Sequence, residues 1–549
     1  MQPDIMHYHY GRILTYLFTD FNGMTKFLTT KFPRVLLIIV LVFLGLLLAL
    51  QARNSLHWRI EQDTPLLHYA AFLMNEYDAV PYRDIFETSM PGTFFFHGVI
   101  GRLFGYSDPA FFIINLVILA FMLAAAFHFM ARFGKTSALF GIILFGLIYF
   151  GKGQTIILQR DFIGLFPIVM ALLLIPVEPE KSVSFTRFAL MGFLLGTASL
   201  FKPQLAISLP IFLFYFLWLR RRNQPHPKLL RGLLITGAGF LLPIALSLLW
   251  LWSNGALKAF LDIFWNYLPL HTGLSGGHEA IRGSERILYL VRNTIRVGGY
   301  PTLLLCAMIV AGWLITKRKE TSGKFASIWF LLALTAAYMI YPILGGKFWS
   351  YHYLPFAFFV SLSATLCITL FFELQSNNRN GLALLILAIF LGSLFLELDP
   401  VKYTQNVVAD ITPDAAAHAP KQGRVDELAK WLESNLPQGD TVQPLDWTGG
   451  SIHAMLIAEA KLATRFMYDY HFYHDVSNPY IQGLRETFIK ELETAQPRYI
   501  IQVIENKPWV SGVDTTREFP ELEELLTENY SLAFEGDGYI ILEKAAKVP

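Results

Sequence analysis

The sequence predicts a polytopic α-helical membrane protein of about eleven transmembrane helices, followed by an outward-facing α/β domain. Two observations support this fold class. Of the 549 residues, 54% are hydrophobic and only 16% are charged, whereas soluble domains carry about 25% charged residues. The apolar residues also gather in long runs as far as residue 398, beyond which charged sequence takes over.

The apolar runs begin after a polar, aromatic segment, residues 1–34. A helix needs about 20 mostly apolar residues to cross the hydrocarbon core, and the first run, 35–50, is followed by further runs rather than by soluble sequence. This order is typical of a signal anchor and not of a cleaved signal peptide. The later runs lie at 109–131, 136–150, 162–176, 188–201, 204–219, 233–252, 299–316, 326–344, 353–372 and 382–398. Residues 35–398 therefore form one predicted membrane domain.

The orientation follows from the short loops that carry clustered basic residues. Such loops face the cytoplasm, so the N-terminal segment is predicted to be cytoplasmic. The long loops at 52–108 and 253–298, and the C-terminus, then face outward. The clusters are Arg132 with Lys135, Lys181 with Arg187, Arg220–Arg222, Lys317–Lys319 and Arg379.

Residues 399–549 contain periodic charged sequence that a bilayer does not accept. Helical patterns at 425–436, 452–460, 484–495 and 521–530 alternate with strand patterns at 441–445, 498–504 and 539–544. This alternation is typical of a small α/β layer domain. From the sequence alone, the domain is a lid or scaffold on the outer face.

Charge and cysteine content exclude two classes of protein. The net charge of +2 is nearly balanced, so no nucleic-acid partner is expected. Cys306 and Cys367 both lie inside apolar runs, so a disulfide framework is excluded.

The first outward loop is longer than fifty residues, which is uncommon for a loop without a function of its own. It contains Glu61, Asp63, Arg83 and Asp84, and its pattern indicates short interfacial helices. Asp63 directly precedes a Thr-Pro pair, so it is either a helix N-cap or a functional carboxylate.

A second carboxylate, Asp161, follows Arg160 where the fourth run begins. It is again either an N-cap or part of a site. Carboxylates from two outward loops can hold one cation or one attacking hydroxyl, and carboxylate oxygens favour Mg²⁺ or Mn²⁺. Asp161 is the candidate metal ligand, and the adjacent arginine suits a phosphate.

Further cations lie at other outward turns. Lys347 and His352 follow a Gly-Gly pair, and Tyr353 comes next; an aromatic interface belt explains the tyrosine but not the two basic residues. Lys202 lies in a tight Phe-Lys-Pro-Gln turn, where a lysine is often only a snorkelling anchor. In the second long loop, His271, His278 and Glu279 fit no strong zinc pattern.

The chain resembles the GT-C class of membrane glycosyltransferases, in the branch of the protein O-mannosyltransferases and the lipid A aminoarabinose transferase. The resemblance lies in the order of the polar motifs within residues 35–372 and in the outward C-terminal domain, as in bacterial relatives. The motifs are Glu61-Gln-Asp63-Thr-Pro65, Pro81-Tyr-Arg-Asp84 with Met90-Pro91-Gly92, Arg160-Asp161, Phe201-Lys202-Pro203-Gln204 and Lys347 with His352-Tyr353.

The resemblance implies a sugar donor linked to a polyprenyl phosphate or diphosphate, and a lipid, glycan or protein acceptor, at a bacterial cytoplasmic membrane. It assigns Asp63 to the acceptor and Asp161 to metal or donor binding. Arg160, Lys202, Lys347 and His352 would bind the donor phosphate, with Glu61, Arg83, Asp84 and Tyr353 in support. The chain has Gln62-Asp63 where the class commonly has an Asp-Glu pair.

Three other functions fit a polytopic protein. A transporter or flippase would place its ionisable groups near the bilayer midplane and use repeated halves, whereas these charges lie at outer helix ends and the halves do not match. A lipid-linked oligosaccharide polymerase or ligase would also use outward loops. A scaffold or sensor would rely on the C-terminal domain.

Overall fold

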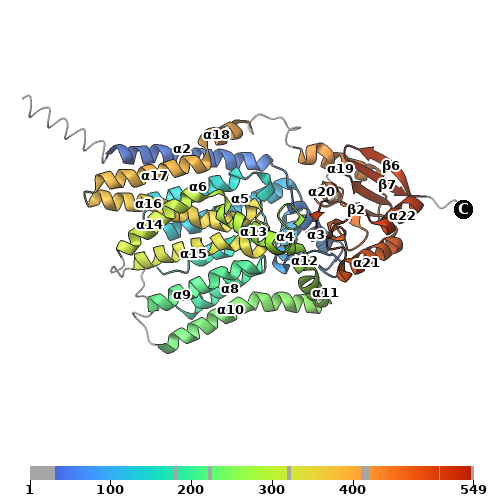
Figure 1. The fold of residues 1–549 in the computed structure, drawn as a ribbon, viewed down its shortest axis with the longest axis horizontal. Helices are drawn as coiled ribbons and strands as arrows, with labels where there is room; N and C mark the ends of the chain where they lie inside the picture. Colours follow the sequence, from blue (N-terminus) through green and yellow to red (C-terminus); the bar gives the residue numbers. More distant parts are fainter. Residues whose placement is uncertain are drawn as a thin grey trace, which may run out of the picture.

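The computed structural model describes residues 31–176, 184–220, 226–317, 323–409, 419–505, 507 and 509–545. A bundle of long helices is joined at one end to a smaller α/β domain (Figure 1). Most of the predicted cytoplasmic segment 1–34, and the basic residues at 181, 221–222 and 318–319, lie outside the described residues.

Each of the eleven predicted apolar runs lies largely within a helix, because a helix satisfies its backbone hydrogen bonds internally where water is absent. The buried centre of the bundle is α16, which packs against α6, α14, α15 and α17. The helices of the bundle are α2 (Phe32–Asn54), α5 (Asp108–Met130), α6 (Lys135–Gly151), α7 (Arg160–Leu172), α8 (Phe185–Ser199), α9 (Ser208–Arg220), α10 (His226–Ser253), α14 (Pro301–Thr316), α15 (Gly323–Gly345), α16 (Leu354–Ser376) and α17 (Asn380–Leu398).

The helices differ in length, and this bears on the number of spans. Among the described residues, six helices are long and apolar enough to cross a membrane, or seven if the pair bent by 80° at residue 300 is one span. Helices such as α7, with 13 residues, rise only about 20 Å against a hydrocarbon core of about 30 Å. The protein is thus a multi-pass membrane protein, and the count of eleven spans stays a prediction.

The two long loops that are predicted to face outward are folded, and most of their elements lie where the bundle meets the α/β domain (Figure 1). Gly92 is the second residue of the second helix in the first loop; its amide donates to the Leu200 carbonyl oxygen at 3.0 Å, and an added Cβ would lie 2.7 Å from that oxygen. This contact seats the loop on the end of α8, next to Lys202. The elements are α3 (Thr64–Glu76) and α4 (Pro91–Phe104) in the first loop, and α11 (Leu257–Asp262), the π-helical η5 (Ile263–Tyr267), α12 (Leu268–Gly273), β1 (Glu279–Ala280) and α13 (Gly283–Ile295) in the second.

The C-terminal domain is built on a five-stranded sheet of order β3-β2-β4-β7-β6. The strands β3, β2 and β4 are parallel, and β7 runs antiparallel to both of its neighbours. The strands are β2 (Thr441–Leu445), β3 (Lys461–Leu462), β4 (Tyr499–Val503), β6 (Tyr530–Gly536) and β7 (Tyr539–Lys544), and the helices are α19 (Arg424–Asn435), α20 (Ser451–Ile457), α21 (Pro479–Ala495) and α22 (Pro520–Asn529).

The segment between the last bundle helix and this domain is helical, and the domain makes one strand pairing with the second long loop. After α17, helix α18 (Pro400–Ala409) stays on the bundle, where the Tyr403 hydroxyl donates to the Leu147 carbonyl at 3.2 Å. The first residues of the predicted domain, from 399, thus belong with the membrane helices. A short strand, β5 (Ser511–Gly512), pairs in parallel with β1 of the second long loop.

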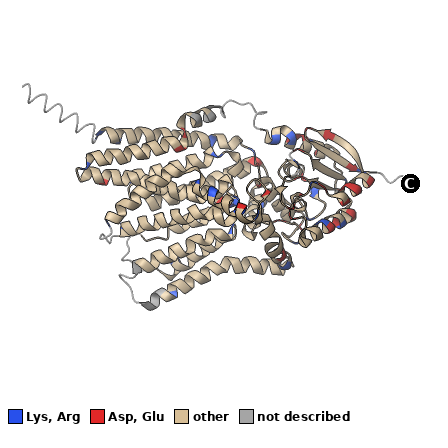
Figure 2. Ribbon diagram, in the orientation of Figure 1, with Lys and Arg blue, Asp and Glu red and all other residues tan. Residues whose placement is uncertain are grey.

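Charged side chains are sparse along the bundle and gather at its junction with the C-terminal domain and on that domain (Figure 2). The polar turns that are predicted to face outward therefore lie at one end of the bundle.

Candidate active site

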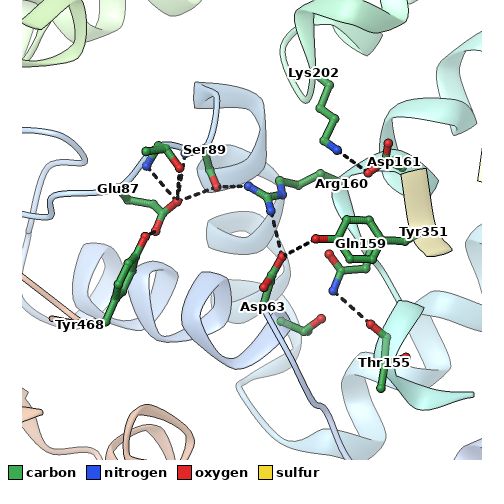
Figure 3. Close-up of polar contacts among 12 residues, drawn as sticks. Asp63, Glu87, Ser89, Thr155, Gln159, Arg160, Asp161, Lys202, Tyr351 and Tyr468 are labelled. Atoms are coloured by element: carbon green, nitrogen blue, oxygen red, sulfur yellow. Dashed lines mark hydrogen bonds and ion pairs between the residues drawn. The ribbon is translucent and has the colours of Figure 1, made fainter. Parts of the chain in front are cut away.

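Asp63 occupies the N-cap position of α3, but its side chain makes no capping hydrogen bond. Its Oδ2 instead accepts hydrogen bonds from Arg160 Nη2 at 2.9 Å and from the Tyr351 hydroxyl at 3.1 Å (Figure 3). The preceding residue, Gln62, has a φ of 57°, a left-handed conformation that costs about 1 kcal/mol or more for a residue with a Cβ. The strained turn directs the carboxylate toward α7 rather than along the axis of α3.

Arg160 links this carboxylate to a second one. Its Nη1 donates to Ser89 Oγ at 2.9 Å, and Ser89 Oγ donates to Glu87 Oε1 at 3.0 Å. The Tyr468 hydroxyl of the C-terminal domain donates to the other oxygen, Glu87 Oε2, at 2.6 Å (Figure 3). Sequence reasoning missed Glu87, Ser89 and Tyr468, because no local spacing marks contacts that join residues 71 and 381 positions apart.

Asp161 lies in the first turn of α7, whose N-cap residue is Gln159. Its Oδ2 accepts from Lys202 Nζ at 2.6 Å and its Oδ1 from the Tyr341 hydroxyl at 2.6 Å. The aspartate side chain is completely buried, and the lysine side chain is 16% exposed. Burial lowers the pKa of Lys202, an effect that Asp161 opposes and the nearby Arg160 reinforces. The pair is a closed polar contact between α7, α15 and the turn after α8.

Lys347 and His352 are both buried, as is Tyr353. Lys347 Nζ has no hydrogen-bond partner among the described residues and lies 5.7 Å from the centre of the Trp349 ring. Burial lowers its pKa to about 7, and Arg286 contributes to this shift. The His352 ring packs 4.8 Å from that of Tyr351. Lys347 and His352 thus lie in the same connection between helices as Tyr351, which contacts Asp63.

The predicted supporting residues do not join the Asp63 cluster. The Tyr353 hydroxyl donates to the Asn293 carbonyl oxygen at 3.3 Å, so Tyr351, two residues earlier, is the tyrosine at Asp63. Arg83 and Asp84 form an ion pair with each other at 2.7 Å on the surface.

Glu61 lies beside a small pocket that also includes Lys421 and His453. Burial raises the pKa of Glu61.

A cavity of about 330 Å³ opens beside Asp63. Gln62 and His278 in its wall have left-handed backbones, as does Phe348, the neighbour of Trp349. Such strain is maintained at functional sites by the surrounding structure. The lining residues come from both long loops, the α6–α7 and α15–α16 connections and the C-terminal domain: Gln62, Asp63, Thr155, His278, Trp349, Ser350, Tyr351, Trp447 and Thr448.

The side chains around Asp161 do not fit a divalent-cation site. Both of its oxygens accept hydrogen bonds, one from an ammonium group. Across the part of the chain that the structure describes, no three His, Cys, Asp or Glu side chains are grouped so as to hold a metal ion, the region of His271, His278 and Glu279 included. A hard cation such as Mg²⁺ prefers several oxygen ligands, and these residues supply too few.

The fold is that of known membrane glycosyltransferases. The chain matches the crystal structure of ArnT, the lipid A aminoarabinose transferase, from Cupriavidus metallidurans bound to undecaprenyl phosphate, with 12% identity and a TM-score of 0.55, over 92% of this chain and 98% of that one. The apo form of the same protein matches with the same identity and TM-score. The archaeal oligosaccharyltransferase AglB from Archaeoglobus fulgidus matches with 13% identity over 95% of this chain and 75% of that one, at a TM-score of 0.49. The two ArnT structures confirm the GT-C resemblance at the level of the fold.

No protein-family model matches the sequence. No curated protein matches it either.

Proposed function

We propose that the protein is a membrane glycosyltransferase that moves a sugar from a polyprenyl-phosphate-linked donor to an acceptor hydroxyl at the outer face of a bacterial cytoplasmic membrane. The observation that carries the proposal is the environment of the Asp63 carboxylate. Its carboxylate makes no capping hydrogen bond to α3, accepts hydrogen bonds from Arg160 and Tyr351 instead, and lines a cavity. Both bonds end on Oδ2, so among the described residues Oδ1 is left for an acceptor hydroxyl.

The donor phosphate belongs on the cationic side of Asp63. Arg160, Lys202, Lys347 and His352 come from α7, the turn after α8 and the α15–α16 connection. An ammonium group such as that of Lys347, buried without a hydrogen-bond partner, is stabilised by an anion. The solved structure of ArnT with undecaprenyl phosphate makes a polyprenyl phosphate the ligand we propose for these cations.

The transfer step does not require a strong general acid. The acceptor oxygen forms a bond to the anomeric carbon, and the bond from that carbon to the phosphate oxygen breaks. The polyprenyl phosphate leaves as an anion that the cations stabilise, and the acceptor proton passes to Asp63. A single displacement of this kind inverts the anomeric centre.

The gathering of charge at one end of the bundle supports this function over transport (Figure 2). A transporter needs ionisable groups near the midplane, whereas Asp63, Arg160, Asp161 and Lys202 lie at helix starts or in turns next to the C-terminal domain. A polymerase or ligase that uses a lipid-linked oligosaccharide would employ the same end and is the alternative reaction.

The proposed topology has eleven spans, with the N-terminus in the cytoplasm and the C-terminal domain outside. Both native cysteines are buried, so a cysteine introduced on α19 as Glu433→Cys would be the main reactive thiol. Labelling of intact cells by a membrane-impermeant maleimide would support the topology, and labelling only after lysis would contradict it.

The function is tested by comparing lipids and envelope glycans of cells with and without the protein. We expect cells without it to accumulate one polyprenyl-phosphate sugar and to lack one glycan residue. Wild-type protein should reverse both changes. Unchanged lipids and glycans would contradict a transferase function and favour the transporter or scaffold alternatives.

A further inference from the structure

The cavity beside Asp63 combines one carboxylate with an aromatic wall. Trp349 and Trp447 both line it, together with His278. The His278 ring lies 5.6 Å from that of Trp349 and 4.5 Å from that of Trp447. The imidazole thus bridges two indoles that come from different parts of the chain, the α15–α16 connection and the loop after β2.

Trp349 is held in place through its indole nitrogen, and Trp447 through its main-chain amide. The Trp349 Nε1 donates to the Gly276 carbonyl oxygen at 2.7 Å. The Trp447 amide donates to Asp446, whose buried carboxylate also accepts from the amides of Gly449 and Ser451. Rigid aromatic side chains lose little conformational entropy when a ligand binds. These two residues are therefore preorganised for contact with a ligand.

The ring of Tyr470 packs against that of Trp447, with 4.7 Å between the ring centres and an angle of 30° between the ring planes. Trp447 and Trp349 nevertheless remain only partly buried, which keeps indole surface available to the cavity. Tyr470 also contacts His278 Nδ1 through its hydroxyl at 3.2 Å. Burial lowers the pKa of His278 to about 3, so this part of the wall is uncharged at neutral pH.

The rest of the cavity lining is polar and carries no Lys or Arg among the described residues. Thr155, Ser350 and Thr448 supply hydroxyl groups and Gln62 an amide. The cations proposed for the donor phosphate lie outside this lining. The lining of the cavity therefore combines apolar ring faces with hydrogen-bonding groups, while Lys347, outside the lining, lies 5.7 Å from the centre of the Trp349 ring.

A sugar ring matches the lining of this cavity. Its C–H face is apolar and packs on aromatic rings, while its hydroxyl groups need donors and acceptors at the edges. The volume of about 330 Å³ lies at the small end of the range for ligand pockets, about 300–1,000 Å³, and suits one or two sugar rings rather than an extended peptide.

We propose that this cavity binds a sugar residue of the acceptor, stacked on Trp447 and Trp349 with one hydroxyl directed at Asp63. The proposal rests on the transferase function and deepens it in two ways. The acceptor is a glycan, and the C-terminal domain takes part in acceptor selection through Trp447 rather than serving only as a lid.

The test is saturation-transfer difference NMR on the full-length protein in nanodiscs. The probes are methyl glycosides of glucose, galactose, mannose and N-acetylglucosamine, with a serine- and threonine-containing tripeptide for comparison. We expect at least one glycoside to bind through its ring C–H face, and Trp447→Ala to weaken that binding about tenfold, as removal of an aromatic anchor does. Trp447→Phe should retain most of the affinity.

Trp265→Ala is the matched control, because Trp265 is 68% exposed and does not line the cavity. If Trp447→Ala lowers the unfolding temperature, Thr448→Trp provides a second test, since it fills the cavity without removing Trp447. Both Trp447→Ala and Thr448→Trp should reduce glycoside binding, and Trp265→Ala should not. Binding that is equal in all variants, absent from the wild type, or seen only with the tripeptide would overturn the proposal.

The outcome is separable from that of the transferase function. If cells lose a glycan residue without the protein but no glycoside binds, the acceptor proposal fails while the function stands. If glycosides bind through Trp447 but lipids and glycans are unchanged, the sugar site stands while the transferase function fails.

Discussion

Asp63 and Asp161 each pair with a cation at the end of the bundle next to the C-terminal domain, but their surroundings differ. The side chains of Asp63 and Arg160 are 18% and 16% exposed, and the ion pair borders a cavity. Asp161 is 0% exposed, with both oxygens bound. A carboxylate that a ligand can reach is able to react, whereas one that is enclosed and saturated positions its neighbours. Under the proposed function, Asp63 takes part in the reaction and Asp161 positions its neighbours.

The largest expected effect is that of Asp63→Asn on sugar transfer. The amide cannot accept the acceptor proton, so the rate should fall about 10²–10⁴-fold, the usual contribution of a general base. The unfolding temperature should change little, because Arg160 keeps its bond to Ser89. Initial rates and thermal unfolding of the purified protein measure both. A rate within tenfold of the wild type would remove Asp63 from the mechanism.

Asp161→Asn should instead affect stability. Removal of one partner from a fully buried ion pair costs about 3–5 kcal/mol; because the Lys202 side chain is 16% exposed, we expect a smaller but measurable loss. The double variant Asp161→Asn with Lys202→Met should recover part of this loss, as measured by denaturant unfolding in detergent. If the single variant is as stable as the wild type, the contrast between the two aspartates fails.

The two tyrosines of the α15–α16 connection provide a matched pair. Tyr351→Phe removes the hydroxyl that donates to Asp63, a bond worth about 1.5–3 kcal/mol because its acceptor is charged. We expect the transfer rate to fall about tenfold or more. Tyr353→Phe removes a hydroxyl that contacts only a backbone carbonyl away from Asp63, so its rate should stay near the wild-type value. Equal effects of the two variants would argue against a role for Tyr351 at the reacting carboxylate.

The smallest expected effect is a pH dependence from Lys347. Burial lowers its pKa to about 7, so the lysine loses its charge as pH rises through 7. Stabilisation by undecaprenyl phosphate, measured as the shift in unfolding temperature, should therefore be larger at pH 6 than at pH 8.5. In Lys347→Met this difference should shrink, and an unchanged difference would exclude Lys347 from phosphate binding.

The same residue affects the protein without ligand in the opposite sense. Between pH 7 and the ordinary lysine value of 10.5, the unfolded chain binds more protons at this position than the folded protein does. The contribution of Lys347 to the free energy of unfolding therefore rises with pH across this window. Comparison of wild type and Lys347→Met by denaturant unfolding at pH 7 and pH 9 measures this contribution.

Much of the architecture was predictable because it depends on local composition. Each apolar run coincides with a helix, and strands β2 and β4 lie where the patterns at 441–445 and 498–504 place them. The number of spans was harder to predict, since α7 and α8 are apolar but short. Hydropathy reports burial in an apolar environment and does not distinguish a full crossing from a partial one.

The candidate site was predictable only in part. Asp63 and Asp161 were each consistent with a helix cap or a site, because a carboxylate at a helix start serves either purpose. The partners decide between these alternatives, and they come from other segments: Arg160 lies 97 residues from Asp63, and Tyr351 lies 288 residues from it. Sequence spacing carries no information about such contacts, which is why Tyr353 was expected at the site instead of Tyr351.

The sequence by itself determined that this is a multi-pass membrane protein whose charged residues lie mainly outside its apolar runs. These properties follow from hydropathy and charge, which act over a few residues at a time. Only the tertiary structure decided that Asp63 is accessible and Asp161 enclosed, and that Trp447 from the C-terminal domain lines the cavity of Asp63. Accessibility and juxtaposition depend on how distant segments pack, and packing is a property of the whole chain.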